Sequence, residues 1–220
     1  MGANAPDIKD LEDQLDAAER DAQALAVGLG EERGGWHADT GSWSVAEYLD
    51  HLASANRVYL HAMKEPAIRA REQGRFRRGP SAPGFVGRWF VRMMEPPVKA
   101  AFRLKAPRII EPRAAPPLGS AFASFRTSQD EVRAFLRACA DLDLAAVRFP
   151  NPFVPGIRFS LATGLHVITA HERRHLWQAW RVRRAAEGAV WPGKMSEIGA
   201  VDPKARANVR VMPWISAWKS

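Results

Sequence analysis

The sequence predicts an all-α protein: a four-helix bundle with a long irregular crossover between helices 2 and 3 and a C-terminal extension. Four segments place apolar residues at steps of three and four, which is the spacing of one helix face. A proline-rich stretch over about residues 65–118 separates the second segment from the third, and little periodicity follows residue 187. We therefore expect the bundle at residues 1–187 and the extension at residues 188–220.

The first predicted helix covers residues 8–25, where acidic residues fill positions between the apolar ones. It stops near Gly28 and Gly30, because glycine favours the ends of helices. A loop that carries Trp36 and His37 follows. The apolar stripe consists of Ile8, Leu11, Leu15, Ala18, Ala22 and Leu25.

The second predicted helix begins with a capping box. The Ser44 side chain can accept a hydrogen bond from a free backbone amide, and Glu47, three residues later, can reach back to Ser44. We expect this helix to end before Pro66, since proline removes a helical hydrogen bond and clashes with the preceding turn. Its stripe consists of Tyr48, His51, Ala55, Val58 and Ala62.

The crossover is basic and is repeatedly interrupted by proline. Within it, residues 85–94 combine apolar and basic side chains in a pattern that predicts a short helix. We expect this helix to patch the bundle, in preference to forming a substrate lid or lying on a membrane surface.

The third predicted helix ends at Cys139, and the fourth is capped by Ser160 and runs to about Glu187. Cys139 lies on the apolar stripe of its helix, so we expect a buried structural thiol and not a nucleophile. A turn over residues 151–156 precedes the fourth helix. The stripes consist of Phe122, Phe125, Gln129, Val132, Leu136 and Cys139 in the third helix, and of Leu165, Ile168, His175 and Val182 in the fourth.

Composition and charge exclude several classes of protein. With 220 residues, 46% of them hydrophobic, the chain fits one globular domain. The net charge of +8 comes mostly from arginine, which suits carboxylate or phosphate groups, but the arginines are spread along the chain and do not favour a nucleic-acid partner. A single cysteine, no signal-peptide pattern and no apolar run of membrane-spanning length predict a cytoplasmic protein without a transmembrane segment.

The histidines suggest a metal site. His171 and His175 are four residues apart, so both imidazoles lie on the same helix face and can share one ion. His51 lies on the core stripe of the second helix, which antiparallel packing can bring opposite the fourth. Three imidazole ligands leave a coordination position open, as in catalytic metal sites. The alternative is that His51 is an ordinary core histidine.

A resemblance strengthens the metal hypothesis. The run from Trp43 to Leu52, followed far downstream by His171, His175 and Gln178 in His-x-x-x-His-x-x-Gln spacing, resembles the DinB/YfiT-like family over about residues 8–186. The resemblance implies a four-helix bundle in which His51, His171 and His175 bind a divalent metal ion. That ion would be nickel or zinc, with iron or manganese as alternatives.

The resemblance also implies a function. It points to a metal-dependent thiol S-transferase, or a related transferase or hydrolase, with a low-molecular-weight thiol such as bacillithiol, mycothiol or glutathione as co-substrate. Relatives of this type are often homodimers. The enlarged basic crossover departs from the family pattern and leaves the substrate open, so we expect only a small anionic or thiol-bearing molecule that crossover arginines can bind.

The sequence is also compatible with two other functions. His171-Glu172-x-x-His175 also matches the zinc-peptidase pattern, in which the glutamate acts as general base. The third ligand of such a site would have to be Glu187 or Glu197, because no histidine follows His175. We expect Glu172 instead to lie at the surface or to support a ligand. The second alternative is a non-catalytic metal-binding or stress-linked interaction protein.

The remaining histidines and the tryptophans near the helices have plainer interpretations. His37, His61 and His166 lie off the two ligand stripes, and we expect structural or solvent-facing roles for them. We expect Trp43 to pack at the end of the bundle as a core residue, and not to line a pocket.

Overall fold

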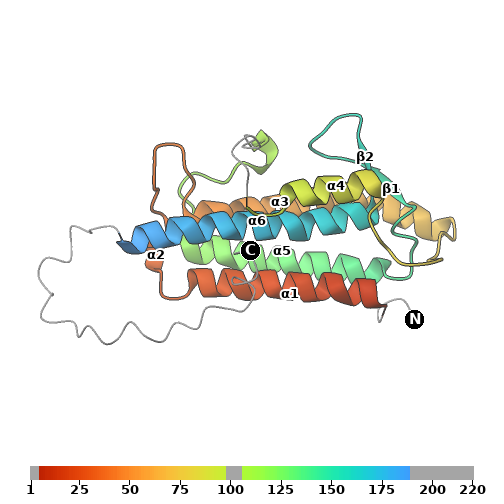
Figure 1. Cartoon of the computed structure of the whole chain (residues 1–220), viewed down its shortest axis with the longest axis horizontal. Helices are drawn as coiled ribbons and strands as arrows, with labels where there is room; N and C mark the ends of the chain where they lie inside the picture. The colour runs from red at the N-terminus through yellow and green to blue at the C-terminus, as the bar shows by residue number, and fades with distance from the viewer. Residues whose placement is uncertain (1–4, 98–105, 189–220) are drawn as a thin grey trace, which may run out of the picture. The chain divides into compact units, whose positions relative to one another are not determined.

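The computed structural model describes residues 5–97 and 106–188, which are mainly helical (Figure 1). None of the helices in this part of the chain is both long and apolar enough to cross a membrane. The elements in chain order are α1 (Pro6–Ala26), α2 (Gly30–Gly34), α3 (Val45–Glu72), α4 (Phe85–Met94), the 3-10 turn η2 (Arg108–Ile110), α5 (Leu118–Cys139), β1 (Arg148–Pro150), β2 (Arg158–Ser160) and α6 (Leu161–Gly188).

Contacts between pairs of helices give the directions of the four long helices, α1, α3, α5 and α6. Helices α1 and α6 are parallel, because a later residue of α1 contacts a later residue of α6. Helices α3 and α5 are parallel for the same reason. Across α3 and α6 the contacts run in opposite order, so these two helices are antiparallel. The contacts are Gln14–Thr169 and Asp21–Trp180 for α1 and α6, Arg57–Ser124 and Arg71–Ala138 for α3 and α5, and His51–His171 and Met63–Gly164 for α3 and α6.

The parallel course of α3 and α5 explains the long crossover. The end of α3 and the start of α5 lie at opposite ends of the helices, so the chain has to travel back along their length (Figure 1). A helix of 22 residues, such as α5, is about 33 Å long. A tight turn cannot span that distance, and the segment between α3 and α5 therefore has to be long.

The helical core consists of two apolar clusters with a polar layer between them. One cluster contains Leu11, Met63, Leu136 and Leu165, and the other contains Leu25, Leu49, Phe125 and Leu176. Between them along the helices lie buried polar side chains of α3, α5 and α6. These are Asn56, Ser128, Gln129, Thr169 and Glu172.

Arginine side chains of α5 form ion pairs with acidic side chains of α1. These pairs account for part of the arginine content that the sequence shows, and they explain why α1 carries acidic residues on the side that faces α5. Each such pair on a protein surface contributes about 1 kcal/mol or less. The pairs are Arg126–Glu19, Arg133–Asp16, Arg133–Glu19 and Arg137–Glu12.

The prediction that the second long helix ends before Pro66 is wrong, because α3 continues through Pro66 to Glu72. Proline in a helix interior costs about 3 kcal/mol. The turns that flank it bury Met63, Ala67 and Ala70 in an apolar cluster, and this burial offsets the cost. The irregular crossover therefore begins near residue 73 and not near residue 65.

Other local predictions agree with the structure. The Ser44–Glu47 capping box forms at the start of α3, and the Ser160 hydroxyl accepts a hydrogen bond from the Thr163 amide at 3.1 Å at the start of α6. The short helix expected over residues 85–94 is α4. The sequence did not predict α2 or the antiparallel pair β1–β2, because elements of five and three residues are too short to show periodicity.

Gly164 sets the distance between α6 and the core. A Cβ atom built there would lie 2.7 Å from the Met63 sulfur of α3 and 2.8 Å from the Phe149 ring. Any side chain at this position would push α6 away from α3, and both helices carry the histidines of interest.

We expect Gly164→Val to lower the free energy of unfolding by about 2 kcal/mol, because overpacking strains the core. Chemical denaturation of both proteins measures the change. The matched control is Gly79→Val, since a Cβ at Gly79 meets no atom within 4 Å. Equal stability of the two variants would show that α6 can shift without cost.

Candidate metal centre

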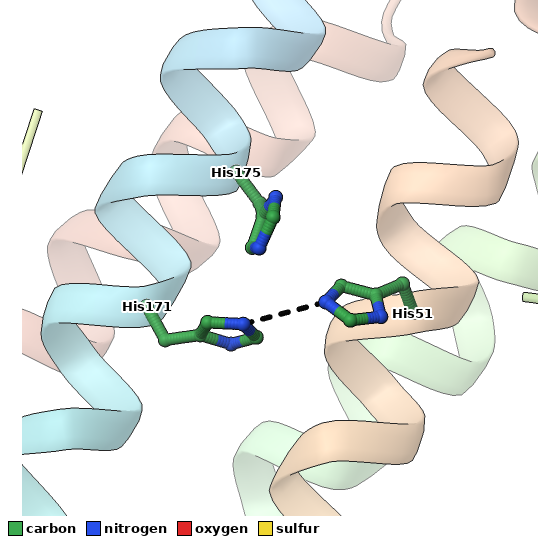
Figure 2. Close-up of side chains that lie close together, drawn as sticks. All are labelled: His51, His171 and His175. Carbon is green, nitrogen blue, oxygen red and sulfur yellow. Dashed lines mark hydrogen bonds between the residues drawn. The ribbon is translucent and has the colours of Figure 1, made fainter. Parts of the chain in front are cut away.

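His51 of α3 and His171 and His175 of α6 converge on one point between the two helices (Figure 2). One ligand nitrogen from each ring lies within 4.8 Å of the corresponding nitrogen of the other two. Within the described ranges this is the only group of three or more histidine, cysteine or acidic side chains arranged so that it can hold a metal ion. The histidine spacing in the sequence predicted the same three residues.

The separations suit coordination of a single ion. His51 Nε2 and His171 Nε2 are 3.3 Å apart. Two nitrogens that each lie about 2.1 Å from one zinc ion at a tetrahedral angle are about 3.4 Å apart. The His175 ring lies 4.6 Å from the His51 ring and 4.4 Å from the His171 ring, measured between centroids. The three rings therefore surround a space of ionic size.

A backbone carbonyl of the crossover orients the His51 ring. His51 Nδ1 lies 2.6 Å from the carbonyl oxygen of Ile110 in η2. Because a carbonyl only accepts, Nδ1 carries the proton, and the lone pair of Nε2 points toward the other two rings. Burial lowers the pKa of His51, although the Ile110 carbonyl and Asp50 act in the opposite direction. The ring is therefore held neutral, as a metal ligand must be.

An ion pair next to His51 fixes the crossover at this point. Arg113 Nε donates to Asp50 Oδ1 at 2.9 Å, and the Arg113 amide donates to Asp50 Oδ2 at 2.8 Å. Burial alone would raise the pKa of Asp50, but the hydrogen bonds and charge of Arg113 outweigh it and lower that pKa. The ionised carboxylate thus holds the segment that supplies the Ile110 carbonyl.

The two histidines of α6 are also held neutral. Burial is the largest cause of the low pKa of both His171 and His175, and the positive charge of Arg174 adds to it. The Nδ1 atom of His175 is buried without a hydrogen-bond partner among the described residues. His51 is buried, whereas His171 and His175 are partly exposed.

Two aromatic residues flank the imidazoles, and one of them corrects the sequence prediction. Trp43 was expected in the core, but it is partly exposed, with its ring 4.6 Å from His51 and 6.1 Å from His175. Tyr48 lies 5.7 Å from the His175 ring. Trp43 is only two residues before the start of α3. Its position at a helix end does not predict that its ring lies beside the imidazoles of His51 and His175.

Of the two roles expected for Glu172, the surface position is wrong, because Glu172 is fully buried in the polar layer; the support of a ligand stays a prediction. Asn56 Nδ2 donates to Glu172 Oε1 at 2.8 Å and to Ser128 Oγ at 3.1 Å. Burial raises the pKa of Glu172 to about 7, and its contacts with Gln129 and Asn56 oppose that rise. A polar residue on the apolar stripe of the third helix, Gln129, was the sequence signal for this layer.

The end of α4 and the residues after it contact α6 beside the histidines. Arg173 Nε donates to Glu95 Oε2 at 3.0 Å, and Arg174 Nη1 donates to the Met93 carbonyl at 3.3 Å. Together with Ile110 and Arg113, these contacts bring two separate parts of the crossover to the site. These parts of the enlarged basic crossover, the feature in which the sequence departs from the family pattern, therefore lie next to the candidate metal centre.

Residues outside the site agree with their structural interpretation. Cys139 is buried, and burial raises the pKa of its thiol to about 11, so it is not a ready nucleophile. His37 pairs with Glu47 at 2.8 Å, and His61 is exposed. Within the described ranges, neither these residues nor His166 joins the three-histidine group.

Glu172→Gln is expected to change the pH dependence of stability. The folded protein holds the Glu172 proton up to about pH 7, whereas a carboxyl with the ordinary value of 4.5 releases it earlier, so wild-type stability falls as pH rises through this window. The variant stays neutral and avoids that fall. Its unfolding free energy relative to wild type should rise by about 3 kcal/mol across the window, measured by denaturation with a chelator present.

The control for this experiment is Glu32→Gln, which makes the same change at an exposed position. Its stability relative to wild type should be independent of pH. A Glu172→Gln variant with an equally flat profile would contradict the assignment of a neutral buried carboxyl.

Comparison with known proteins supports the family resemblance. The model of the DinB superfamily matches residues 14–179, which include all of α3 and α5 and the three histidines. No curated protein and no solved structure matches the chain. Because the match covers most of the sequence, the chain belongs to the DinB superfamily.

Proposed function

We propose that this protein binds one divalent metal ion through His51, His171 and His175 and uses it in a transferase reaction of the thiol S-transferase type. The observation that carries the proposal is the convergence of three neutral imidazoles whose nitrogens lie within 4.8 Å of one another. The ion would supply Lewis-acid chemistry, lowering the pKa of a thiol or water so that a nucleophile exists at neutral pH.

The ligand set favours a catalytic over a structural role. Structural zinc sites use four protein ligands, whereas three protein ligands leave a position for substrate. Imidazole suits nickel, zinc and iron, and we propose nickel or zinc as the ion. The partial exposure of His171 and His175 provides the side from which a substrate would approach.

The surrounding side chains have roles that follow from their positions. The Ile110 carbonyl keeps the His51 proton on Nδ1, and the Asp50–Arg113 pair keeps that carbonyl in place. Trp43 and Tyr48 would exclude water from one side of the rings. The charge of Arg174 lies close enough to His171 and His175 to lower their pKa, and it would favour an anionic or thiol-bearing small molecule.

The family resemblance supports finer proposals on architecture and cell biology. We propose that α1, α3, α5 and α6 form a four-helix bundle of the DinB type, that residues 188–220 are an extension of it, and that the protein works as a cytoplasmic homodimer. The directions of the four helices and the single crossover between α3 and α5 fit such a bundle.

The geometry does not favour the zinc-peptidase alternative. A general base has to reach a water on the metal, yet the Glu172 carboxylate is fully buried and accepts a hydrogen bond from Asn56. We therefore carry forward the transferase as the catalytic hypothesis.

His51→Ala should remove the bound metal while the fold persists. Loss of one of three ligands should weaken metal affinity by more than about a hundredfold, since even changes to residues that only support a ligand cost about 10–100-fold. Elemental analysis of protein purified without an affinity tag, together with metal titration, measures the effect. Retention of one tightly bound ion by the variant would contradict the proposed ligand set.

The matched control is His61→Ala, which removes an exposed histidine outside the site. This variant should bind metal as wild type does. Circular dichroism of both variants checks that the helices form.

The reaction class is tested by incubating metal-loaded protein with electrophiles and each of bacillithiol, mycothiol and glutathione. We expect at least one thiol to be consumed faster than with metal-free protein, and His51→Ala to abolish the difference. Metal binding without any rate above the metal-free control would reject the transferase and favour the non-catalytic metal-binding protein.

A further inference from the structure

Helix α4 has apolar side chains on two sides, and the fold covers only one of them. Phe90 and Val91 pack against an apolar cluster, and the Phe90 ring lies 4.9 Å from the Phe159 ring between centroids. Gly87 is buried so closely that a Cβ atom there would collide with the Thr163 hydroxyl. These contacts fix α4 on the helical core and determine which side faces outward.

The outward side carries large apolar residues. Phe85 is 79% exposed, Val86 64% and Trp89 57%. Residues three and four apart lie together on a helix, so Phe85, Trp89 and the exposed Arg88 and Arg92 form one stripe with Val86 beside it. We call these five residues the α4 surface. Contiguous exposed apolar side chains of this size mark a contact site.

The charge of the α4 surface is positive. Helix α4 contains no acidic residue. In the part of the chain that the structure describes, neither Arg88 nor Arg92 forms an ion pair; Arg88 donates to the Pro83 carbonyl at 3.0 Å. The nearest acidic residue along the chain, Glu95, pairs with Arg173. The complement of this surface is therefore an anionic layer with an apolar interior beneath it.

We propose that α4 binds the surface of an anionic lipid bilayer. Phe85, Val86 and Trp89 would enter the headgroup region, where aromatic side chains are favoured, while Arg88 and Arg92 contact lipid phosphates. A second copy of the chain is a poorer occupant, because symmetric contact would bring the arginines of both copies together. The proposal is independent of the metal reaction.

Binding by so small a surface is weak and reversible. A helix that lies in the interface is held by buried apolar area and by attraction to anionic lipid. Attraction to the lipid charge falls with ionic strength, because salt screens it within about 10 Å at 0.1 M. The expected behaviour is partial, salt-dependent association and not stable anchoring.

Sedimentation of the full chain with vesicles tests the proposal. The protein should pellet with vesicles of phosphatidylcholine and phosphatidylglycerol in equal parts, and not with phosphatidylcholine alone. Phe85→Ser with Trp89→Ser should abolish pelleting. Arg88→Gln with Arg92→Gln should lower the partition coefficient by about fivefold for each arginine.

A matched control removes the same charge elsewhere. Arg20→Gln with Arg184→Gln changes two exposed arginines outside α4 and should leave vesicle binding nearly unchanged. Equal losses in the two arginine pairs, or absence of wild-type binding to the anionic vesicles, would overturn the proposal. The proposal would also be overturned if the wild-type chain formed a dimer and bound no vesicles, and if Phe85→Ser with Trp89→Ser converted that dimer to a monomer.

Discussion

A layer of buried polar side chains divides the helical core, and its hydrogen bonds connect α3, α5 and α6. Asn56 of α3 donates both to Ser128 of α5 and to Glu172 of α6. Loss of one partner from such a layer leaves a buried polar group unpaired, at a cost of about 1–3 kcal/mol. The layer therefore sets the register of the three helices. His171 directly precedes Glu172 and His51 lies little more than one turn before Asn56, so the two histidines meet only in that register.

The crossover has a second role beyond joining α3 to α5. Because those helices are parallel, the chain has to return along their length, and on the way it supplies the Ile110 carbonyl to His51 and the Arg113 side chain to Asp50. A connection that topology requires is thus also the part that orients a candidate ligand. The two described parts of the crossover, the end of α4 with Glu95 and residues 106–113, are both held to the long helices by such contacts.

Helices and ligands could be predicted from the sequence because both follow local rules of spacing. The stripes of α1, α5 and α6 and the four-residue spacing of His171 and His175 are periodic, and the Ser44 capping box is a short motif. The continuation of α3 through Pro66 could not be predicted, since it depends on core burial that overrides a local penalty. The Ile110 contact and the burial of Glu172 depend on segments that are 59 and 116 residues away from their partners. Gln129, a polar residue on an apolar stripe, was the one local sign of the polar layer.

The crossover is anchored to the long helices on both sides of the candidate site, by Glu95 on Arg173 and by Ile110 and Arg113 on His51 and Asp50. Loop-closure entropy rises slowly, so that doubling the length of a loop costs only about 0.6 kcal/mol. A change in the number of residues between Glu95 and Ile110 would therefore cost little, and the Ile110 carbonyl would still orient the His51 ring.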